Sequence, residues 1–257
     1  MTRPLRVATW NLHECVPMPG SGVADPEAAV RQVAELLTEL EVDLVALQEL
    51  DLAADGHSPS LRWLAASTDL VHQAVYPLSE SSFFAGRSTG VALASRYPLE
   101  RVERLPLPNP GLRTELAGRP IASHNKGLVV AEVAVAGQPL VAASLHAFPF
   151  HLFGRRADEP AFAGQWSALT GLLAPLAGAP LVVGGDFNTD RRDLVLAGLG
   201  GRLERALGDQ PTYRRESADD VLHSQHLLAK QAGLRSNFSD HLLCHVEFHL
   251  GLEGPCP

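Results

Sequence analysis

The sequence contains few cysteines, and they follow no recognisable spacing. Only Cys15, Cys244 and Cys256 occur in a chain of 257 residues. An odd and sparse set argues against a disulfide framework, and none of the spacings is that of a zinc finger. We therefore expect a protein of a reducing compartment, the cytoplasm.

Long apolar runs are also missing. No stretch approaches the roughly 20 apolar residues that a membrane-spanning helix needs. Residues 1–4 lead straight into a strand pattern and not into the apolar core of a signal peptide. Hydrophobic residues make up 46% and charged residues 19% of the chain, which is typical of a globular protein. Because repeats and low-complexity linkers are absent, we expect one monomeric domain over residues 1–257.

Positive charge is in short supply. The formal net charge of −8 argues against capture of nucleic acid by bulk electrostatics, which usually requires a basic face. Lysine occurs only as Lys126 and Lys230, so arginine carries almost all of the positive charge. A locally basic cleft is still compatible with this composition.

Two common catalytic motifs and a zinc triad are absent. Gly184 and Gly185 lack the lysine and the serine or threonine of a phosphate-binding P-loop. No Gly-x-Ser-x-Gly elbow of acyl hydrolases occurs. His223 and His226 lie close together in sequence, but they do not form a spaced zinc triad.

Hydrophobic periodicity predicts alternating strands and helices. Helices are expected to begin at Asp25 and Ser58, where a capping residue precedes a proline, and near Asp158 and Asp193. The segment 105–125, which is rich in proline, glycine and arginine, is expected to be a long loop. Strands are predicted at 5–10, 43–47, 90–95, 128–134, 140–145, 181–186 and 242–248.

Polar residues follow or precede five of these strands. Each alone could be a turn or a helix cap. Ligand sites of layered sheet proteins lie where strand ends converge, so five coincidences indicate one shared site. Oxygen ligands from these residue types suit Mg²⁺ or Mn²⁺ better than zinc, and they suggest hydrolysis of a phosphate ester. The residues are Asn11, Glu49, His146, Asp186 with Asn188, and Asp240 with His241.

The strand that ends at Asp186 carries the clearest signal. Gly184 and Gly185 are expected to let the backbone turn sharply. In extended geometry Asp186 and Asn188 would point to the same side. This geometry suits the holding of a water molecule or a phosphate oxygen.

The ordered motifs resemble the endonuclease/exonuclease/phosphatase superfamily, which includes abasic-site endonucleases, pancreatic-type deoxyribonucleases, neutral sphingomyelinases and inositol-polyphosphate phosphatases. The segment 90–98 resembles its central strand, and 211–213 the segment before its fifth motif. The resemblance covers nearly the whole chain and implies an α/β fold, a four-layer α/β/β/α sandwich with two mixed β-sheets packed face to face. The matching motifs are residues 10–11, 48–49, 144–146, 185–188 and 239–241.

The resemblance also implies a role for each matching position. Glu49 would be the principal metal ligand, with Asn11 and Asp240 completing the shell. Asp186 would orient or deprotonate the attacking water. Asn188 would donate a hydrogen bond to the phosphate or to the nucleophile.

The histidines complete the implied site. His241 would act as acid/base or phosphate-stabilising residue, oriented by Asp219 or, alternatively, by Asp220. His146 resembles the second phosphate histidine of the deoxyribonuclease and sphingomyelinase branches, where a glutamate pairs with it, and Glu80 is the candidate here. The chain departs from the abasic-site branch two residues after Asn11, where His13 replaces an acidic ligand.

The loops around these motifs point to an anionic substrate. Four sets of arginines flank them in an otherwise acidic chain. The aromatic residues 148, 150, 151 and 153 could stack on a base, contact a lipid or anchor their loop. The arginines are Arg113 with Arg119, Arg155 with Arg156, Arg191 with Arg192, and Arg214 with Arg215.

The sequence as a whole predicts a Mg²⁺-dependent phosphodiesterase, with nucleic acid the favoured substrate. A phosphomonoesterase or a sphingomyelinase-like hydrolase of a small or lipid phosphate is the alternative within enzymes. A scaffold that binds phosphate ligands without turnover is the third interpretation.

Overall fold

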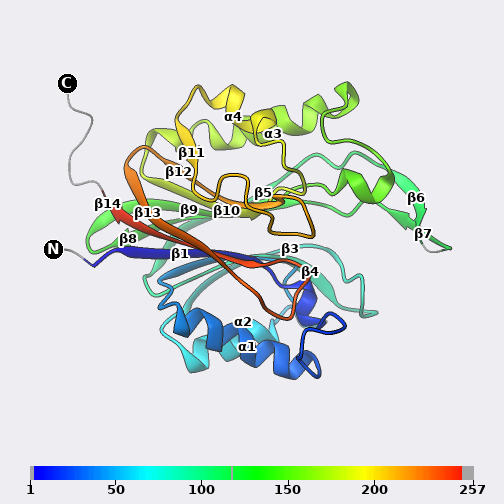
Figure 1. Ribbon diagram of the computed structural model, residues 1–257, viewed down its shortest axis with the longest axis horizontal. Coiled ribbons are helices and arrows are strands. Elements are labelled where there is room, and N and C mark those ends of the chain that lie inside the picture. The colour runs from blue at the N-terminus through cyan, green and yellow to red at the C-terminus, as the bar shows by residue number, and fades with distance from the viewer. Residues whose placement is uncertain (1–2, 117, 251–257) are drawn as a thin grey trace.

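Two six-stranded sheets lie face to face at the centre of the computed structural model, which describes residues 3–116 and 118–250 (Figure 1). Cys256 and both ends of the predicted 1–257 domain lie outside the described residues. Sheet A has the order β13-β14-β1-β2-β4-β3. Its strands are β1 (Leu5–Asn11), β2 (Leu44–Gln48), β3 (His72–Glu80), β4 (Ser88–Ser95), β13 (Leu227–Arg235) and β14 (Leu243–Leu250).

Sheet B has the order β11-β12-β10-β9-β8-β5. Both sheets are mixed: β1 runs parallel to β2, and β9 parallel to β10, while the other pairs are antiparallel. The strands of sheet B are β5 (Leu99–Pro106), β8 (Gly127–Val135), β9 (Gln138–His146), β10 (Leu181–Asp186), β11 (Leu203–Arg205) and β12 (Asp219–Ser224).

Helices cover the outer face of each sheet, so the expected four-layer α/β/β/α sandwich is confirmed (Figure 1). Helices α1 (Pro26–Glu39) and α2 (Pro59–Ser67) pack on sheet A. Helices α3 (Ala163–Leu173) and α4 (Asp193–Leu196) pack on sheet B. No helix among the described residues combines the length and apolarity needed to cross a bilayer. Short 3₁₀ segments are η1 (His13–Cys15), η2 (Phe150–Phe153), η3 (Pro160–Phe162), η4 (Leu176–Gly178) and η5 (Ala197–Leu199).

The first two helices begin where the sequence predicts. Asp25 Oδ1 accepts a hydrogen bond from the Ala28 N–H at 2.8 Å, and Ser58 Oγ accepts one from the Leu61 N–H at 3.1 Å. Each cap satisfies a backbone donor that the helix leaves free, and the proline that follows has no N–H to lose. The helix expected from Asp158 begins later, because residues 160–162 form η3 before α3 starts.

Five strands of the two sheets (β3, β5, β11, β12 and β13) and a hairpin escape the hydrophobic pattern. Strands β3 and β13 lie at the two edges of sheet A, each has a register shift, and their exposed residues interrupt the apolar alternation. The expected loop 105–125 contains the antiparallel pair β6 (Arg113–Leu116) and β7 (Arg119–Ala122), which joins neither sheet. The loop expectation was therefore wrong for these residues.

The two sheets approach closely at Gly184. A Cβ added there would lie 2.7 Å from Ala46 Cβ and 2.9 Å from Thr9 Cβ. Gly184 and Gly185 both lie inside β10, so the expected sharp turn at this pair is wrong. Glycine is needed at Gly184 because sheet A leaves no room for a side chain.

We predict that Gly184→Ala destabilises the fold by about 1–3 kcal/mol, because the added methyl group forces the sheets apart. Urea unfolding at pH 7 measures this loss. The control is Gly171→Ala on α3, where an added Cβ meets nothing within 4 Å. There alanine should gain up to about 1 kcal/mol from helix propensity. Equal stability of Gly184→Ala and wild type would contradict the close approach.

Candidate active site

The candidate site forms where the parallel strands of both sheets end. Strand register places Asp186 opposite His146 on one side and opposite Asp219 on the other. Side chains two residues apart on a strand share a face. Asp186 therefore faces sheet A, as Gly184 does, and Asn11 faces sheet B, as Thr9 does. The close approach lets Asn11 Nδ2 donate to Asp186 Oδ2 at 3.0 Å.

Asp186 is a buried carboxylate held at both oxygens. Its Oδ1 accepts the Asn188 N–H at 2.8 Å, and Oδ2 accepts Asn188 Nδ2 at 3.2 Å in addition to Asn11. Asn188 lies beyond the strand in the left-handed region, with φ of 53°, so it reaches Asp186 by a turn and not by extended geometry. Burial raises the pKa of Asp186 to about 6, against the opposing effects of His241 and these hydrogen bonds.

His241 forms a dyad with Asp219. His241 Nδ1 bonds to Asp219 Oδ2 at 2.8 Å, and the Tyr213 ring stacks on the imidazole at a centroid distance of 4.5 Å. Burial alone would lower the pKa of His241, but the carboxylates of Asp219 and Asp186 together raise it to about 10. The imidazole is therefore protonated at neutral pH.

The sequence left open whether Asp219 or Asp220 orients His241, and in the structure Asp219 is the one that contacts the imidazole. Asp220 points to the other face of β12, as the alternation of a strand requires. There its Oδ2 accepts a hydrogen bond from Arg205 Nε at 2.7 Å and lies 3.6 Å from Arg192 Nε.

Lys126 is a member of the site that the motifs do not reveal. It precedes β8, whose first residue pairs with His146, and its Nζ lies 2.8 Å from His146 Nε2. Burial, together with Lys126 and His241, lowers the pKa of His146 well below its usual value, so this imidazole is neutral. Burial also lowers the pKa of Lys126, although Glu49 and Asp186 oppose this. The scarcity of lysine was the only hint in the sequence.

The expected pairing of Glu80 with His146 is wrong. The carboxylates within 4 Å of His146 Nε2 in the described chain are those of Asp186, at 3.5 Å, and Glu49, at 3.9 Å. Glu80 ends the edge strand β3, pairing there with Ser88.

Glu49 has the most available carboxylate of the site. It follows β2 with φ of 46°, its side chain is 29% exposed, and its carboxylate accepts no hydrogen bond within residues 3–116 and 118–250. Asp240 is half-buried, and its neighbour Ser239 donates from Oγ to the Asn11 carbonyl oxygen at 2.8 Å, which fixes this segment on β1. Asn11 Oδ1 already accepts the His13 N–H at 3.0 Å.

These residues fit a divalent cation. A metal of the Mg²⁺ type needs hard oxygen donors, and the carboxylates of Glu49 and the buried Asp186 both lie within 4 Å of His146 Nε2. Asp219 Oδ1 is buried and has no hydrogen-bond partner in the part of the chain described. Asp186, Asp219 and His241 also offer ligand atoms within 4.8 Å of one another, but the Asp219–His241 hydrogen bond favours an orienting role for that pair.

The turn η1 adds a buried acid that sequence reasoning missed. His13, Glu14 and Cys15 have φ values of 49°, 51° and 57°, a run of left-handed residues without glycine. Such backbone is strained and persists only where the surroundings impose it. The Glu14 N–H donates to the Glu49 carbonyl oxygen at 2.9 Å, and its carboxylate accepts the Ser82 N–H at 3.0 Å.

Two of the four arginine pairs are not free to bind an anion. Arg155 is paired with Glu159, Arg156 with Asp158, and Arg191 with both Asp158 and Asp193. Arg192 is buried over the Phe187 ring and donates to three backbone carbonyl oxygens. The expectation that all four sets attract the substrate is therefore wrong. Those without an ion pair among the described residues are Arg113, Arg119, Arg214 and Arg215.

The aromatic residues after His146 mainly anchor their loop. Phe150 is 1% exposed and packs on Phe162 at a centroid distance of 4.2 Å, and Phe148 is 5% exposed. His151 is different, because it lies 6.1 Å from the Tyr213 ring, at the wall of a cavity of about 380 Å³ that also contacts Asn188. This cavity is the opening beside the candidate site.

His223, one of the two histidines that lie close together in the sequence, packs in the core. His223 is buried on β12, with its ring edge-to-face against Phe248 at 5.1 Å.

Residues 8–241 match the model described as Endonuclease/Exonuclease/phosphatase family. No curated protein sequence matches significantly. The structure of the chain resembles that of an endonuclease/exonuclease/phosphatase from Beutenbergia cavernae. The sequence identity is 21% and the TM-score 0.72, and the match covers 97% of this chain and 72% of that one.

Two further structures share the fold. The human nocturnin catalytic domain with bound sulfate anion is 22% identical, with a TM-score of 0.69 and coverage of 96% and 94% of the two chains. A mannosyl-6-phosphatase from Bacteroides thetaiotaomicron is 14% identical, with a TM-score of 0.68 and coverage of 96% and 100%. At these identities the similarity demonstrates the fold and not the substrate.

We predict that the His241–Asp219 pair makes stability depend on pH. The folded pKa of about 10 exceeds the usual 6.5, so the stabilisation is fully present below pH 6.5 and is lost as pH rises towards 10. Urea unfolding at several pH values should show a loss on the order of a few kcal/mol. Asp219→Asn should flatten this dependence, whereas Asp209→Asn, which alters an exposed ion pair, should not. An unchanged slope in Asp219→Asn would contradict the assignment.

Proposed function

The chain belongs to the endonuclease/exonuclease/phosphatase family, and from this membership we propose that it is a metal-dependent phosphodiesterase, in which water attacks the phosphorus in line. One observation carries the proposal. The buried Asp186 carboxylate is fixed between a neutral His146 and a protonated His241. One site therefore contains both a proton acceptor, Asp186, and a proton donor, His241.

Asp186 is suited to take the proton from water. A pKa of about 6 leaves it ionised at neutral pH, yet more basic than an exposed aspartate. The amides of Asn11 and Asn188 hold its orientation, so little reorganisation is needed when the water is bound.

His241 is suited to stabilise charge or protonate the leaving oxygen. Asp219 holds Nδ1, which directs Nε2 towards the site. Nε2 lies 3.9 Å from Asp186 Oδ2, beyond hydrogen-bond distance, so its proton is free for the substrate.

Lys126 adds a second positive charge near the phosphate position. Its Nζ is held beside His146 and is attracted by Glu49 and Asp186. A phosphate oxygen placed between Lys126 and His241 would receive charge-assisted hydrogen bonds from both sides.

Glu49, with Asn11 and Asp240, would hold the divalent cation, Mg²⁺ or Mn²⁺. When bound, the cation supplies Lewis-acid polarisation of the phosphate oxygens. Cation binding is expected to depend on Glu49, because its carboxylate is partly exposed and accepts no hydrogen bond within the described residues.

A phosphomonoesterase of a small phosphate is the second candidate. Neighbouring acids engage Arg155, Arg156 and Arg191, which removes three loop charges that a long polyanion would need. This favours a substrate of one or two phosphate groups over a long nucleic acid, whichever ester is cleaved.

We predict that purified protein hydrolyses bis(p-nitrophenyl) phosphate in the presence of Mg²⁺ or Mn²⁺ and loses activity in EDTA. Asp186→Asn and His241→Ala should each reduce kcat by about 10²–10⁴-fold, since each removes one proton-transfer group. Glu35→Gln, an exposed change on α1, serves as the control.

The outcome separates the candidates. Faster hydrolysis of p-nitrophenyl phosphate than of the diester would indicate the phosphomonoesterase. Absence of turnover on both esters, DNA, RNA and sphingomyelin, with metal still bound, would contradict an enzyme and leave the phosphate-binding scaffold.

Lys126→Gln should reduce kcat by about 10–10²-fold. Lys126→Arg should retain part of the wild-type kcat, because an arginine, like a lysine, can donate charge-assisted hydrogen bonds to a phosphate oxygen. Lys230→Gln provides a matched control, since the other lysine of the chain lies exposed on the edge strand β13. Steady-state kinetics on the preferred ester make the comparison. Equal rates for Lys126→Gln and Lys230→Gln would contradict a role for Lys126.

A further inference from the structure

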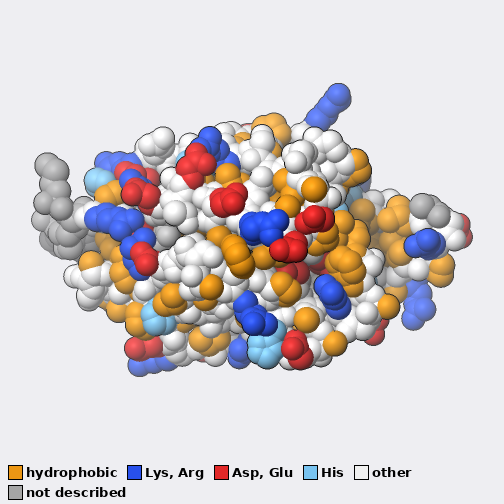
Figure 2. All heavy atoms as spheres, turned by 90° about the horizontal axis from the view of Figure 1, so that it is seen from below, with side chains coloured by type: hydrophobic (Ala, Val, Ile, Leu, Met, Phe, Trp, Pro, Cys, Tyr) orange, Lys and Arg blue, Asp and Glu red, His pale blue; other side chains and the backbone are white. Residues whose placement is uncertain are grey.

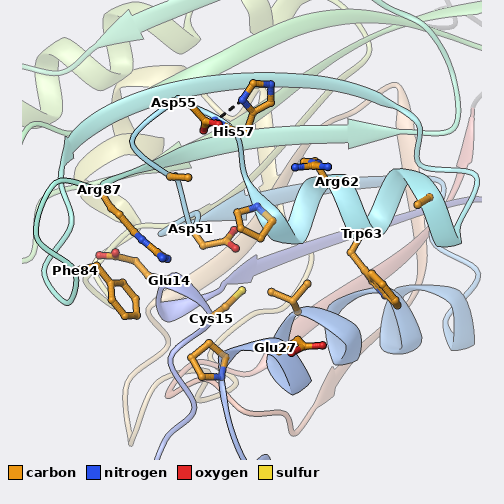
Figure 3. A pocket seen from close by; sticks show the side chains of 15 residues that line it. Glu14, Cys15, Glu27, Asp51, Asp55, His57, Arg62, Trp63, Phe84 and Arg87 are labelled. Atoms are coloured by element: carbon orange, nitrogen blue, oxygen red, sulfur yellow. Dashed lines mark hydrogen bonds and ion pairs between the residues drawn. The ribbon is translucent and has the colours of Figure 1, made fainter.

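A second cavity lies between α1, α2 and the segments that follow β2 and β3 (Figure 3). Its volume is about 570 Å³, within the range of small-molecule sites. Neither Asp186 nor His241 lines it. The cavity is therefore distinct from the candidate active site.

Aromatic and apolar side chains form much of its wall. Trp63 on α2 is 44% exposed, which is unusual for so large an apolar side chain. Phe84 lies on the opposite side of the cavity in the view of Figure 3, and Val30 contributes from α1. Planar apolar surfaces of this kind favour a flat ring as ligand.

Two arginines at the wall of this cavity have no acidic partner in the described chain. Arg62 and Arg87 are exposed at its wall, and neither forms an ion pair within the described residues. Arg87 is held over the Phe84 ring, with its guanidinium carbon 4.7 Å from the centroid. Two guanidinium groups without acidic partners favour an anionic group, which Arg recognises through paired N–H donors.

The acids of the same cavity already have partners. Asp51 accepts Ser58 Oγ at 2.7 Å and the Ser60 N–H at 3.1 Å. Glu27 is paired with Arg31, and Asp55 with His57. These carboxylates therefore do not neutralise Arg62 and Arg87. Those that are buried can still accept further N–H donors through their remaining lone pairs.

From these features we propose that the cavity binds a mononucleotide, with the base against Trp63 and Phe84 and the phosphate at Arg62 and Arg87. A ligand that contacts both the aromatic and the arginine part of the wall must carry a flat ring and an anionic group in one small molecule. The N–H edge of the base would meet the buried carboxylates of Asp51 and Glu14. Glu14 also joins this cavity to the candidate active site, because its N–H donates to the Glu49 carbonyl oxygen at 2.9 Å.

The test is titration of the full chain with AMP, followed by tryptophan fluorescence and calorimetry. Trp10 and Trp166 are buried, so quenching reports Trp63. Wild type should bind AMP more tightly than adenosine or inorganic phosphate. The double variant Arg62→Ala/Arg87→Ala should weaken binding at least tenfold, whereas Arg101→Ala, an exposed change on β5 away from the cavity, should not.

Asp186→Asn separates this site from the proposed activity. Binding of AMP should persist in that variant, even if hydrolysis of every ester fails in wild type. Binding that is lost in Asp186→Asn but kept in the double arginine variant would place the ligand at the active site and overturn the proposal. Absence of quenching and of heat at millimolar AMP would overturn it as well.

Discussion

The close approach of the two sheets at Gly184 is the contact on which the candidate site depends. Sheets packed around ordinary side chains are about 10 Å apart, too far for a short amide to reach a carboxylate across the gap. Where glycine faces Thr9 and Ala46, the gap narrows, and Asn11 bonds directly to Asp186. One missing side chain thus joins the ends of two separate sheets.

A buried polar ladder extends this contact. Gln48 Nε2 donates to Ser144 Oγ at 3.1 Å, and Ser144 Oγ donates to the Leu47 carbonyl oxygen at 2.9 Å, so both bonds cross between the sheets. Buried polar groups are costly unless paired, so these bonds also fix which residues face each other. Apolar packing elsewhere between the sheets would tolerate more variation in which residues face each other.

Burial then decides where protons reside. Asp186 and His146 are both buried and neighbouring, yet burial raises the pKa of the acid and lowers that of the imidazole, because it disfavours the charged form of each. His241 is the exception, since the carboxylates of Asp219 and Asp186 together outweigh the effect of burial on its pKa. The same buried environment therefore yields a basic carboxylate, a neutral imidazole and a protonated one.

The sequence by itself determined the two helix starts and the set of polar strand ends, because periodicity and capping are local properties, while the four layers were implied by the resemblance of its ordered motifs to a known family. It could not choose between Asp219 and Asp220, since only pairing of β12 with β10 decides which of two neighbours faces the site. Lys126 and the neutralised arginines also escaped it. Their contacts join residues distant in sequence, such as Lys126 with His146 and Arg191 with Asp158, and such contacts form only when the chain is packed.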